Sequence, residues 1–348
     1  MSGPKILGLA TAVPKYGVEQ QEVRQFAAGM FKKKFHGLER MLSIFEHGNI
    51  KKRYFSCPLE WYSRPHTFNE TNCQFEKTAL ELAYAASTKA IDKAGILASD
   101  IGGVVFVTST GITTPTLDAK LIQRLGLSLH ALRLPVWGLG CAGGVTGIAR
   151  AAELAKAVTD RVILLVVVEL CSITFQRNDF SKSNLVGTSI FADGAAAVVI
   201  GTCGSGPEII SSHSTLFPDT EDIMGWDVVE SGLKVRFSRD IPSIIRNHLP
   251  ELLAEACTQW GIDQTHLQHY IVHPGGAKVL TAYSESLGLE PGKLSDAENI
   301  LENYGNMSSA SVFFVLEEHM KANCITNDYG VMLALGPGFS AEQVLFKW

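Results

Sequence analysis

Continuous apolar segments alternate along the chain with segments that are apolar on one side only. Short runs with few polar residues occur at 104–107, 162–168, 270–272 and 331–335. Runs of this length predict strands that are buried on both faces. Between them, segments such as 145–158 and 310–320 carry apolar residues at helical spacing. This alternation predicts a layered α/β protein with mainly buried sheets.

The same order of elements occurs twice. Residues 79–107 and 244–272 each contain a helical segment, a Gly-Ile pair and an apolar strand, and a loop and a helix ending in Leu-Gly-Leu follow each copy. Cys141 in the first copy corresponds to Asn306 in the second. A duplication predicts two similar halves, residues 1–203 and 204–348, that form one catalytic unit. Cys141 and Asn306 are then expected to face each other where the halves join.

The N-terminal region contains two further elements. The apolar stretch 5–13 is short for a secretion signal, and Pro14 ends it, so we expect a buried strand. Residues 20–41 are expected to form a helix that packs over the core or at a dimer interface. Its apolar residues at helical spacing are Val23, Phe26, Ala27, Met30, Phe31, Phe35, Leu38 and Met41.

Composition narrows the class of protein. The 348 residues are 46% hydrophobic and carry a formal charge of −5 at pH 7. This balance argues against a disordered or nucleic-acid-binding chain. No apolar run approaches the roughly 20 residues that a membrane-spanning helix needs. The cysteines are scattered without a C-x-x-C pair, which argues against a disulfide framework or a metal site and fits the cytoplasm; they are Cys57, Cys73, Cys141, Cys171, Cys203, Cys257 and Cys324.

Cys141 has the surroundings of a nucleophile. An apolar run ends in Gly138-Leu139-Gly140, the cysteine follows, and Gly143-Gly144 opens a helical pattern. A thiol at a helix N-terminus feels the positive end of the dipole, which favours the thiolate. The glycines would let a substrate carbonyl approach backbone N–H groups. A lone cysteine in an apolar setting is more often structural, so its partners matter.

Two downstream residues supply possible partners. His273 closes an apolar strand before Pro274-Gly275-Gly276, and Asn306 follows Gly305 at the start of a helix. Each taken alone could be a capping or core residue. Three such residues, each at a glycine-marked element end, predict a Cys-His-Asn site.

With these residues in place, the whole chain resembles the type III polyketide synthases, the chalcone-synthase-like branch of the thiolase-fold condensing enzymes. The resemblance implies an α/β, thiolase-like fold in which duplicated βα halves form a five-layered α-β-α-β-α core. It also implies a homodimer and a catalytic triad of Cys141, His273 and Asn306. No metal and no cofactor beyond the CoA thioester substrates is implied. The motifs that carry it are Gly140–Gly144, Phe191–Ala197, His273–Gly276, Gly305–Ala310 and Gly336–Phe339.

The resemblance also implies a reaction. Cys141 would carry a starter acyl group as a thioester, and His273 and Asn306 would hold the enolate formed when malonyl-CoA loses CO2. Residues 20–41, with Phe45 and Trp61, resemble the opening of Bacillus-type alkylpyrone synthases. Those accept fatty acyl-CoA starters, so a medium- or long-chain starter and an alkylpyrone product are expected.

Further site residues follow from the resemblance position by position. Val235 stands where the family carries a second phenylalanine, and the smaller side chain would widen the pocket for an aliphatic starter. Arg40 falls on one of three basic CoA-binding positions of plant members, His47 falls on another, and Lys51 lies nearby. The expected substrate-binding residues are Phe191, Thr174, Val235, Ser308, Gly275, Gly276 and Thr114.

Alternative functions remain open at this stage. A malonyl-CoA-primed synthase of naphthalene or resorcinol products would use the same triad. A ketoacyl-ACP synthase III would be expected to show an asparagine close behind the histidine and a basic docking surface, and here Pro274-Gly275-Gly276 follows His273. A hydroxymethylglutaryl-CoA synthase would use a glutamate such as Glu169, but the Asn306 motif fits it less well. A non-catalytic acyl-binding scaffold has no need for all three triad residues.

Overall fold

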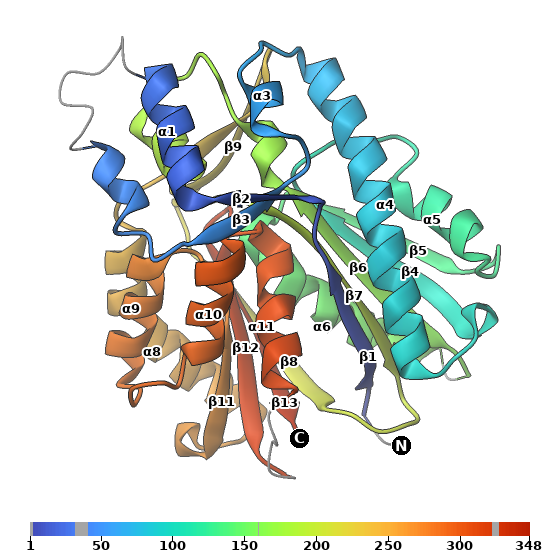
Figure 1. The fold of residues 1–348 in the computed structure, drawn as a ribbon. Coiled ribbons are helices and arrows are strands. Elements are labelled where there is room, and N and C mark those ends of the chain that lie inside the picture. The colour runs from blue at the N-terminus through green and yellow to red at the C-terminus, as the bar shows by residue number, and fades with distance from the viewer. Residues whose placement is uncertain (1–2, 32–40, 159, 322–326) are drawn as a thin grey trace.

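The computed structural model describes residues 3–31, 41–158, 160–321 and 327–348. Within them a nine-stranded mixed sheet forms the centre of the molecule (Figure 1). In spatial order its strands are β11 (Leu267–Val272), β12 (Tyr329–Gly336), β13 (Ser340–Lys347), β8 (Glu208–Leu216), β1 (Lys5–Ala12), β7 (Asp193–Gly201), β6 (Val162–Leu170), β4 (Ile101–Thr108) and β5 (Leu132–Trp137).

The sheet is two half-sheets that meet at one point. Strands β1 and β8 pair through a single residue pair, Lys5 with Glu208. In the first half, β4 runs parallel to β6, which is antiparallel to β7, which is antiparallel to β1. In the second half, β11, β12, β13 and β8 repeat this order and these directions. The repeat visible in the sequence is therefore present in the strand topology, with β5 as an additional edge strand.

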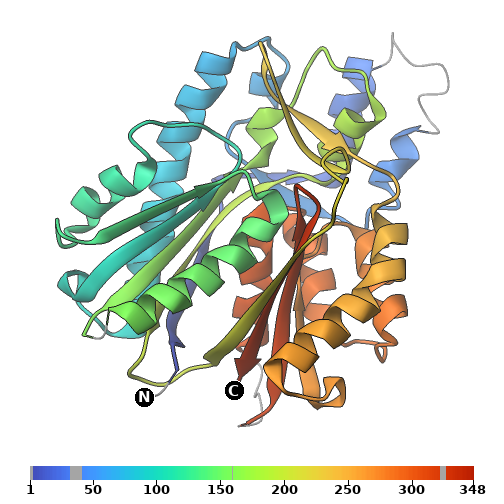
Figure 2. The same ribbon diagram turned by 180° about the vertical axis from the view of Figure 1, so that it is seen from behind.

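Helices cover both faces of each half-sheet, giving layers in the expected order α-β-α-β-α (Figures 1 and 2). Helices α6 (Gly143–Ala157) and α11 (Ser311–His319) lie between the half-sheets. The outer face of the first half carries α4 (Phe68–Ala94) and α5 (Leu117–Leu125). The second half is covered by α8 (Ile241–Trp260) and α9 (Ala277–Leu287), and α10 (Ser295–Tyr304) packs beside α11.

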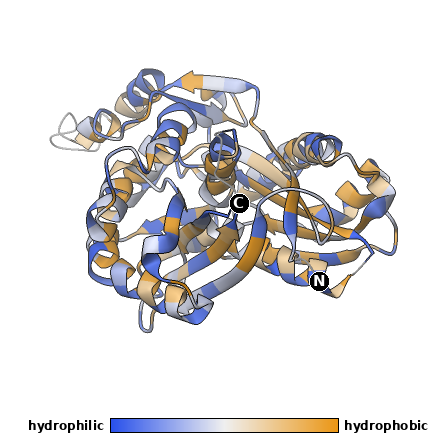
Figure 3. Cartoon of the chain, turned by 90° about the horizontal axis from the view of Figure 1, so that it is seen from below, coloured by the Kyte–Doolittle hydropathy of each residue, from blue (hydrophilic) through white to orange (hydrophobic). Residues whose placement is uncertain are grey.

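Burial on both faces explains why the strands show no alternation of polar and apolar residues. Along β6, Ile163, Leu165 and Val167 belong to the core around α6, which is continuous with the core around α11. The intervening residues Leu164 and Val166 belong to the core under α4. The hydropathy colouring accordingly shows orange along the inner strands and mixed colour on the surrounding helices (Figure 3).

The two central helices approach each other closely at their N-terminal ends. A Cβ added at Gly144, in the first turn of α6, would lie 2.3 Å from the Ser309 carbonyl oxygen. Only glycine fits there without displacing the segment that precedes α11. Because Cys141 precedes α6 and Asn306 precedes α11, this contact brings the two segments together as the repeat predicts.

A smaller layer lies over one end of the half-sheets, where the strands preceding Cys141 and His273 finish (Figure 1). It contains the ribbon of β2 (Tyr16–Glu19) with β3 (Lys52–Phe55) and the hairpin of β9 (Met224–Val229) with β10 (Gly232–Phe237). The helix expected over 20–41 is α1 (Gln20–Phe31) in the structure, and 32–40 lie outside the described residues. Two short helices complete the layer, α3 (Leu59–Tyr62) and α7 (Lys182–Ile190).

None of the described helices is both long enough and apolar enough to cross a membrane.

Candidate active site

Cys141 lies on a short 3-10 turn, Gly140–Ala142, between β5 and the first residue of α6. Gly140 adopts a φ of 46°, a left-handed value that glycine reaches without strain. Its N–H donates to the Ser109 hydroxyl at 3.0 Å, which fixes the position of the turn. The cysteine itself is only 7% exposed.

His273 follows the last residue of β11 and is held by its backbone. Its N–H donates to the Leu333 carbonyl oxygen at 2.9 Å, which continues the pairing of β11 with β12. The imidazole is buried, and both ring nitrogens, Nδ1 and Nε2, have no hydrogen-bond partner among the described residues. Buried polar atoms are rarely left unpartnered, so this ring is available to a substrate or to the thiol.

Asn306 is fixed by its backbone and by both ends of its amide. Its N–H donates to the Ile190 carbonyl at 2.8 Å, and its own carbonyl accepts from the Ala192 N–H at 2.8 Å. Its Nδ2 donates to the Gly275 carbonyl at 3.0 Å, while its Oδ1 accepts from the Ser308 N–H at 2.8 Å. An amide nitrogen carries two hydrogens, so one donor remains beyond the Gly275 bond.

All three side chains line one cavity of about 700 Å³, which we call the catalytic cavity. The size is in the range of small-molecule sites. Three basic residues also line it: His47, Arg239 and Lys278. Ser308 joins the group, because its hydroxyl lies 3.6 Å from the Cys141 sulfur as a hydrogen-bond donor.

Burial controls the protonation states. It raises the pKa of the Cys141 thiol to about 12, against the lowering effect of hydrogen bonds from Ser308 and Asn306. It also lowers the pKa of His273 to about 3. Desolvation acts against the helix-end effect that the sequence suggested, and it favours the neutral forms of the thiol and of the imidazole. A neutral imidazole next to a thiol can accept its proton during reaction.

A buried carboxylate stands behind the thiol. Glu169, near the end of β6, accepts from the Ser309 hydroxyl at 2.5 Å, the Ser109 N–H at 2.9 Å and the Thr110 hydroxyl at 2.8 Å. Burial raises its pKa to about 7 despite these donors. When ionised, its charge disfavours the Cys141 thiolate and raises the pKa of the thiol.

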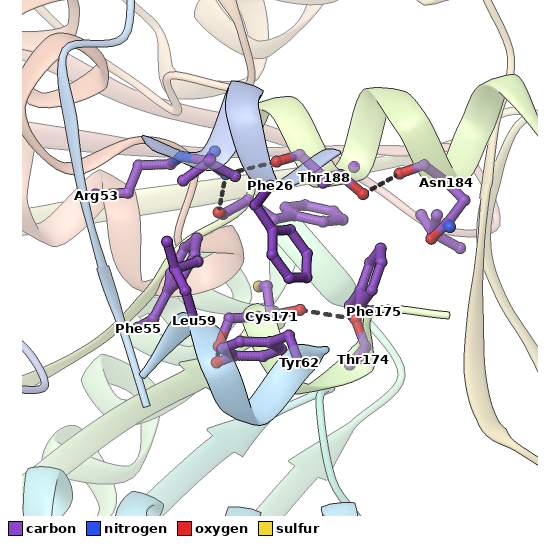
Figure 4. Close-up of a pocket in the computed structure, with 15 residues that line it drawn as sticks. Phe26, Arg53, Phe55, Leu59, Tyr62, Cys171, Thr174, Phe175, Asn184 and Thr188 are labelled. Carbon is purple, nitrogen blue, oxygen red and sulfur yellow. Dashed lines mark hydrogen bonds between the residues drawn. The ribbon is translucent and has the colours of Figure 1, made fainter. Parts of the chain in front are cut away.

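The remaining predicted residues fall into separate places. Gly275 and Gly276 line the catalytic cavity. Phe191, Thr174 and Val235 line a second, mainly apolar cavity between α1, α3 and α7, which we call the apolar cavity (Figure 4).

Thr114 is exposed on the loop between β4 and α5 and is not among the described residues lining either cavity. Of the expected CoA contacts, His47 lines the catalytic cavity, whereas Lys51 pairs with Glu302 at 2.6 Å. Arg40 lies outside the described residues.

Sequence reasoning missed four residues that shape the site. The Phe191 ring packs against Phe237 and Trp226, with ring centroids 5.5 and 6.0 Å apart. Phe237 comes two residues after Val235, so an aromatic ring is present although its position is shifted. Arg239 and Lys278 line the catalytic cavity as cations. The charged residues of Ser238-Arg239-Asp240, and Lys278 two residues after Gly276, were the available signals.

Among the described residues, no group of three or more His, Cys, Asp or Glu side chains could hold a metal ion.

A buried thiol, an unpartnered imidazole and an oriented amide in one cavity, on a duplicated α/β fold, define a thiolase-like condensing enzyme. Comparison with known proteins specifies the family. Residues 2–204 match the N-terminal domain of chalcone and stilbene synthases, and residues 208–348 match their C-terminal domain. The chain belongs to this family and is a type III polyketide synthase, an acyltransferase.

Individual relatives cover nearly the whole chain. A putative chalcone synthase of Bacillus subtilis is 40% identical over 360 residues, covering 99% of this chain and 98% of the relative. A 1,3,6,8-tetrahydroxynaphthalene synthase of Streptomyces peucetius is 36% identical, covering 99% and 93%. The solved structure of the 1,3,6,8-tetrahydroxynaphthalene synthase of Streptomyces coelicolor has a TM-score of 0.94 at 29% identity, covering 99% of both chains.

Replacing Glu169 with Gln tests the electrostatic arrangement. The substitution removes a negative charge that disfavours the thiolate, so the pKa of Cys141 should fall. We expect iodoacetamide to inactivate Glu169→Gln several-fold faster than wild type between pH 8 and 10, with the pH profile moved to lower pH. Glu153→Gln, a change on the exposed side of α6, is the control. If the pH profile of inactivation were unchanged or moved to higher pH, Glu169 would not be raising the pKa of the Cys141 thiol.

Proposed function

We propose that the enzyme loads an aliphatic acyl-CoA starter on Cys141, extends it by decarboxylative Claisen condensation with malonyl-CoA, and releases cyclised alkylpyrone-type products. The observation that carries the starter class is the apolar cavity beside the catalytic cavity, walled by Phe191 and Val235. The roles of Cys141, His273 and Asn306 are part of the proposal.

Loading follows from the neutral thiol and imidazole. His273 takes the Cys141 proton as the sulfur attacks the carbonyl carbon of the acyl-CoA. The tetrahedral intermediate collapses to an acyl-Cys141 thioester, and the CoA thiolate leaves with the proton from His273. Since the pKa of His273 is lowered by burial, the imidazolium gives up this proton readily.

Extension uses the two donors. Malonyl-CoA bound in the cavity loses CO2, and the electron pair of the broken C–C bond moves into an enolate whose oxygen becomes negative. The second Asn306 Nδ2–H, which is not bonded to the Gly275 carbonyl, and a protonated ring nitrogen of His273 would hold that oxygen. Each such donor is commonly worth about 3 kcal/mol. The enolate carbon attacks the acyl-Cys141 carbonyl, and the lengthened chain can return to Cys141.

An aliphatic starter suits the apolar cavity. Its walls include Phe26, Phe55, Leu59 and Val235, and each buried methylene group contributes about 0.8 kcal/mol. The cavity holds only about 40 Å³, room for roughly three water-sized groups. A longer chain therefore has to displace the partly buried side chains of Phe26 and Leu59. The free energy needed to open the cavity in this way contributes to the preference for one chain length over another.

A malonyl-CoA-primed aromatic polyketide is the second candidate. It is supported by the relatives whose names include tetrahydroxynaphthalene synthase. Product analysis separates the two, because aromatic product from malonyl-CoA alone requires no acyl starter.

The proposed chemistry predicts the behaviour of two variants. Cys141→Ala should form no polyketide and no acyl adduct, while keeping the wild-type fold by circular dichroism. Asn306→Ala should load acyl groups but decarboxylate malonyl-CoA about a hundredfold more slowly, because one enolate donor is lost. Mass spectrometry of protein and products, with malonyl-CoA and acyl-CoAs from acetyl to stearoyl, measures both steps. Polyketide formed by Cys141→Ala at the wild-type rate would refute the assignment of Cys141 as the nucleophile. If Asn306→Ala lost acyl loading and malonyl-CoA decarboxylation equally, the role of Asn306 would be structural.

Val235→Phe tests the starter pocket. The larger ring would fill the space beside Phe191 and Gly187. This space is already narrow, because a Cβ added at Gly187 would lie 3.3 Å from the Phe191 side chain and 3.4 Å from the Val235 side chain. We expect the preferred starter to shorten by several carbons, measured as kcat/KM across the acyl-CoA series. Val228→Phe, on the exposed part of the same hairpin, is the control. An unchanged chain-length profile would exclude Val235 from the pocket.

We also propose a cytoplasmic homodimer formed through β5. Among the described residues β5 is a sheet edge, and Leu132 and Trp137 on it are 49% and 47% exposed. An exposed apolar edge strand is a template for pairing with another chain. The six described cysteines are all free, in keeping with a reducing compartment.

Sedimentation measures this assembly. We expect the sedimentation mass of wild type to be twice the 37.7 kDa of one chain. Leu132→Glu should shift the protein toward the monomer, because it places a charge on the β5 edge where the two chains would pair. Leu97→Glu, at another exposed leucine, should leave the mass unchanged. A monomeric wild type would contradict the proposal.

A further inference from the structure

A third cavity adjoins the apolar cavity. It holds about 290 Å³ and is lined from three segments: 61–71, 175–179 and the end of the β9–β10 hairpin. Tyr62 and Phe175 line both this cavity and the apolar cavity, so they form the partition between the two. Tyr62 is buried and hydrogen-bonded to the Ser172 hydroxyl at 2.6 Å, whereas Phe175 is only partly buried.

The lining of this third cavity is rich in cations. Arg64, Arg177 and Lys234 line it together with the His66 imidazole, against one carboxylate, Asp179. This excess of positive charge occurs in a chain whose formal charge is −5. We call it the cationic cavity.

Only some of the hydrogen-bond donors of these charged side chains have partners among the described residues. Lys234 Nζ lies 3.6 Å from Asp179 Oδ2, which neutralises that pair. Arg177 uses its Nε to donate to the Ser63 carbonyl at 3.0 Å, and its two terminal nitrogens have no assigned acceptor among the described residues. The Arg64 guanidinium likewise has no assigned acceptor there and is exposed. Two guanidinium groups are therefore available to a carboxylate.

The walls around these cations are held in place. Trp61 and His66 stack with ring centroids 3.8 Å apart, and a His66 ring nitrogen lies 2.9 Å from the Trp61 carbonyl. On the opposite side, buried Gln176 bonds both Ser231 and the Leu233 carbonyl, which ties the hairpin to the 175–179 segment. The cationic cavity is thus a fixed feature of the fold.

The order of the three cavities defines the ligand. Ile190 of the catalytic cavity is followed in the chain by Phe191 of the apolar cavity. The apolar cavity in turn shares Tyr62 and Phe175 with the cationic cavity, which Arg64 and Arg177 also line. An apolar section that ends in guanidinium groups fits an alkyl chain with a carboxylate at its end. A nucleotide does not fit the apolar section, and the basic residues suited to CoA phosphates, Arg239 and Lys278, line the catalytic cavity instead.

We infer that the cationic cavity binds the carboxylate of an alkyl chain that occupies the apolar cavity. The inference rests on the proposed function, because it assumes that the apolar cavity takes an alkyl chain. Two sources share this chemistry. The carboxylate is either the far end of a dicarboxylic starter carried on Cys141, or the head of a free fatty acid that enters from outside and competes with the starter.

Two arms distinguish the sources. In the first, kcat/KM is measured for monothioesters of C8 to C16 dicarboxylic acids with CoA and for the matching fatty acyl-CoAs. If the dicarboxylic starter is the ligand, Arg64→Gln with Arg177→Gln should lower its kcat/KM about tenfold relative to the fatty acyl-CoA. In the second, dodecanoate is tested as an inhibitor of dodecanoyl-CoA turnover. If the free acid is the ligand, the double variant should raise its inhibition constant about tenfold, while dodecanol inhibits both proteins equally.

Lys89→Gln, an exposed cation on α4, is the charge control for both arms. The inference is overturned if wild type neither prefers the dicarboxylic starters nor is inhibited by dodecanoate. It is also overturned if the double variant changes neither the ratio of kcat/KM between the two starter classes nor the inhibition constant of dodecanoate. Calorimetric binding of dodecanoate to Cys141→Ala separates this outcome from failure of the proposed function, since it needs no turnover. Absence of any acyl adduct on wild-type Cys141 would end the proposed function, whereas dodecanoate binding lost in the double variant would still support the cationic cavity.

Discussion

The close contact of α6 with the segment before α11 is the constraint on which the rest of the site depends. Because Gly144 has no side chain, the N-terminal ends of two equivalent helices meet between the half-sheets. One of these ends carries the thiol and the other carries the amide, so the duplicated fold brings its two reactive segments together at its centre. Burial is the result, and it raises the pKa of Cys141 and lowers the pKa of His273.

Much of this was predictable from the sequence. Strands buried on both faces and helices with one apolar side leave strong local patterns, and the repeat predicted that Cys141 and Asn306 would meet. Glycines marked the ends of the elements that carry all three triad residues. These features are local in the chain, so one sequence is enough to find them.

The pocket was less predictable because it depends on side chains that meet only through tertiary packing. Val235 was expected to leave space where the family carries a phenylalanine, and only the structure shows that Phe237 and Trp226 pack against Phe191 from the same hairpin. Lys51 was expected to contact CoA, and its ion pair with Glu302 could not be read from the sequence. The helix end and His273 were expected to favour the thiolate, whereas desolvation, a property of the whole cavity, makes the largest contribution to the thiol pKa and raises it.

The backbone pairing of Asn306 with the segment 190–192 has a mechanical consequence. The wall that carries Phe191 and the backbone of Asn306 are joined by two hydrogen bonds, and Arg53 also donates to the Phe191 carbonyl at 2.7 Å. Displacement of one of these segments would therefore displace the other. The ring that lines the apolar cavity and the amide that lines the catalytic cavity are thus mechanically coupled through the main chain.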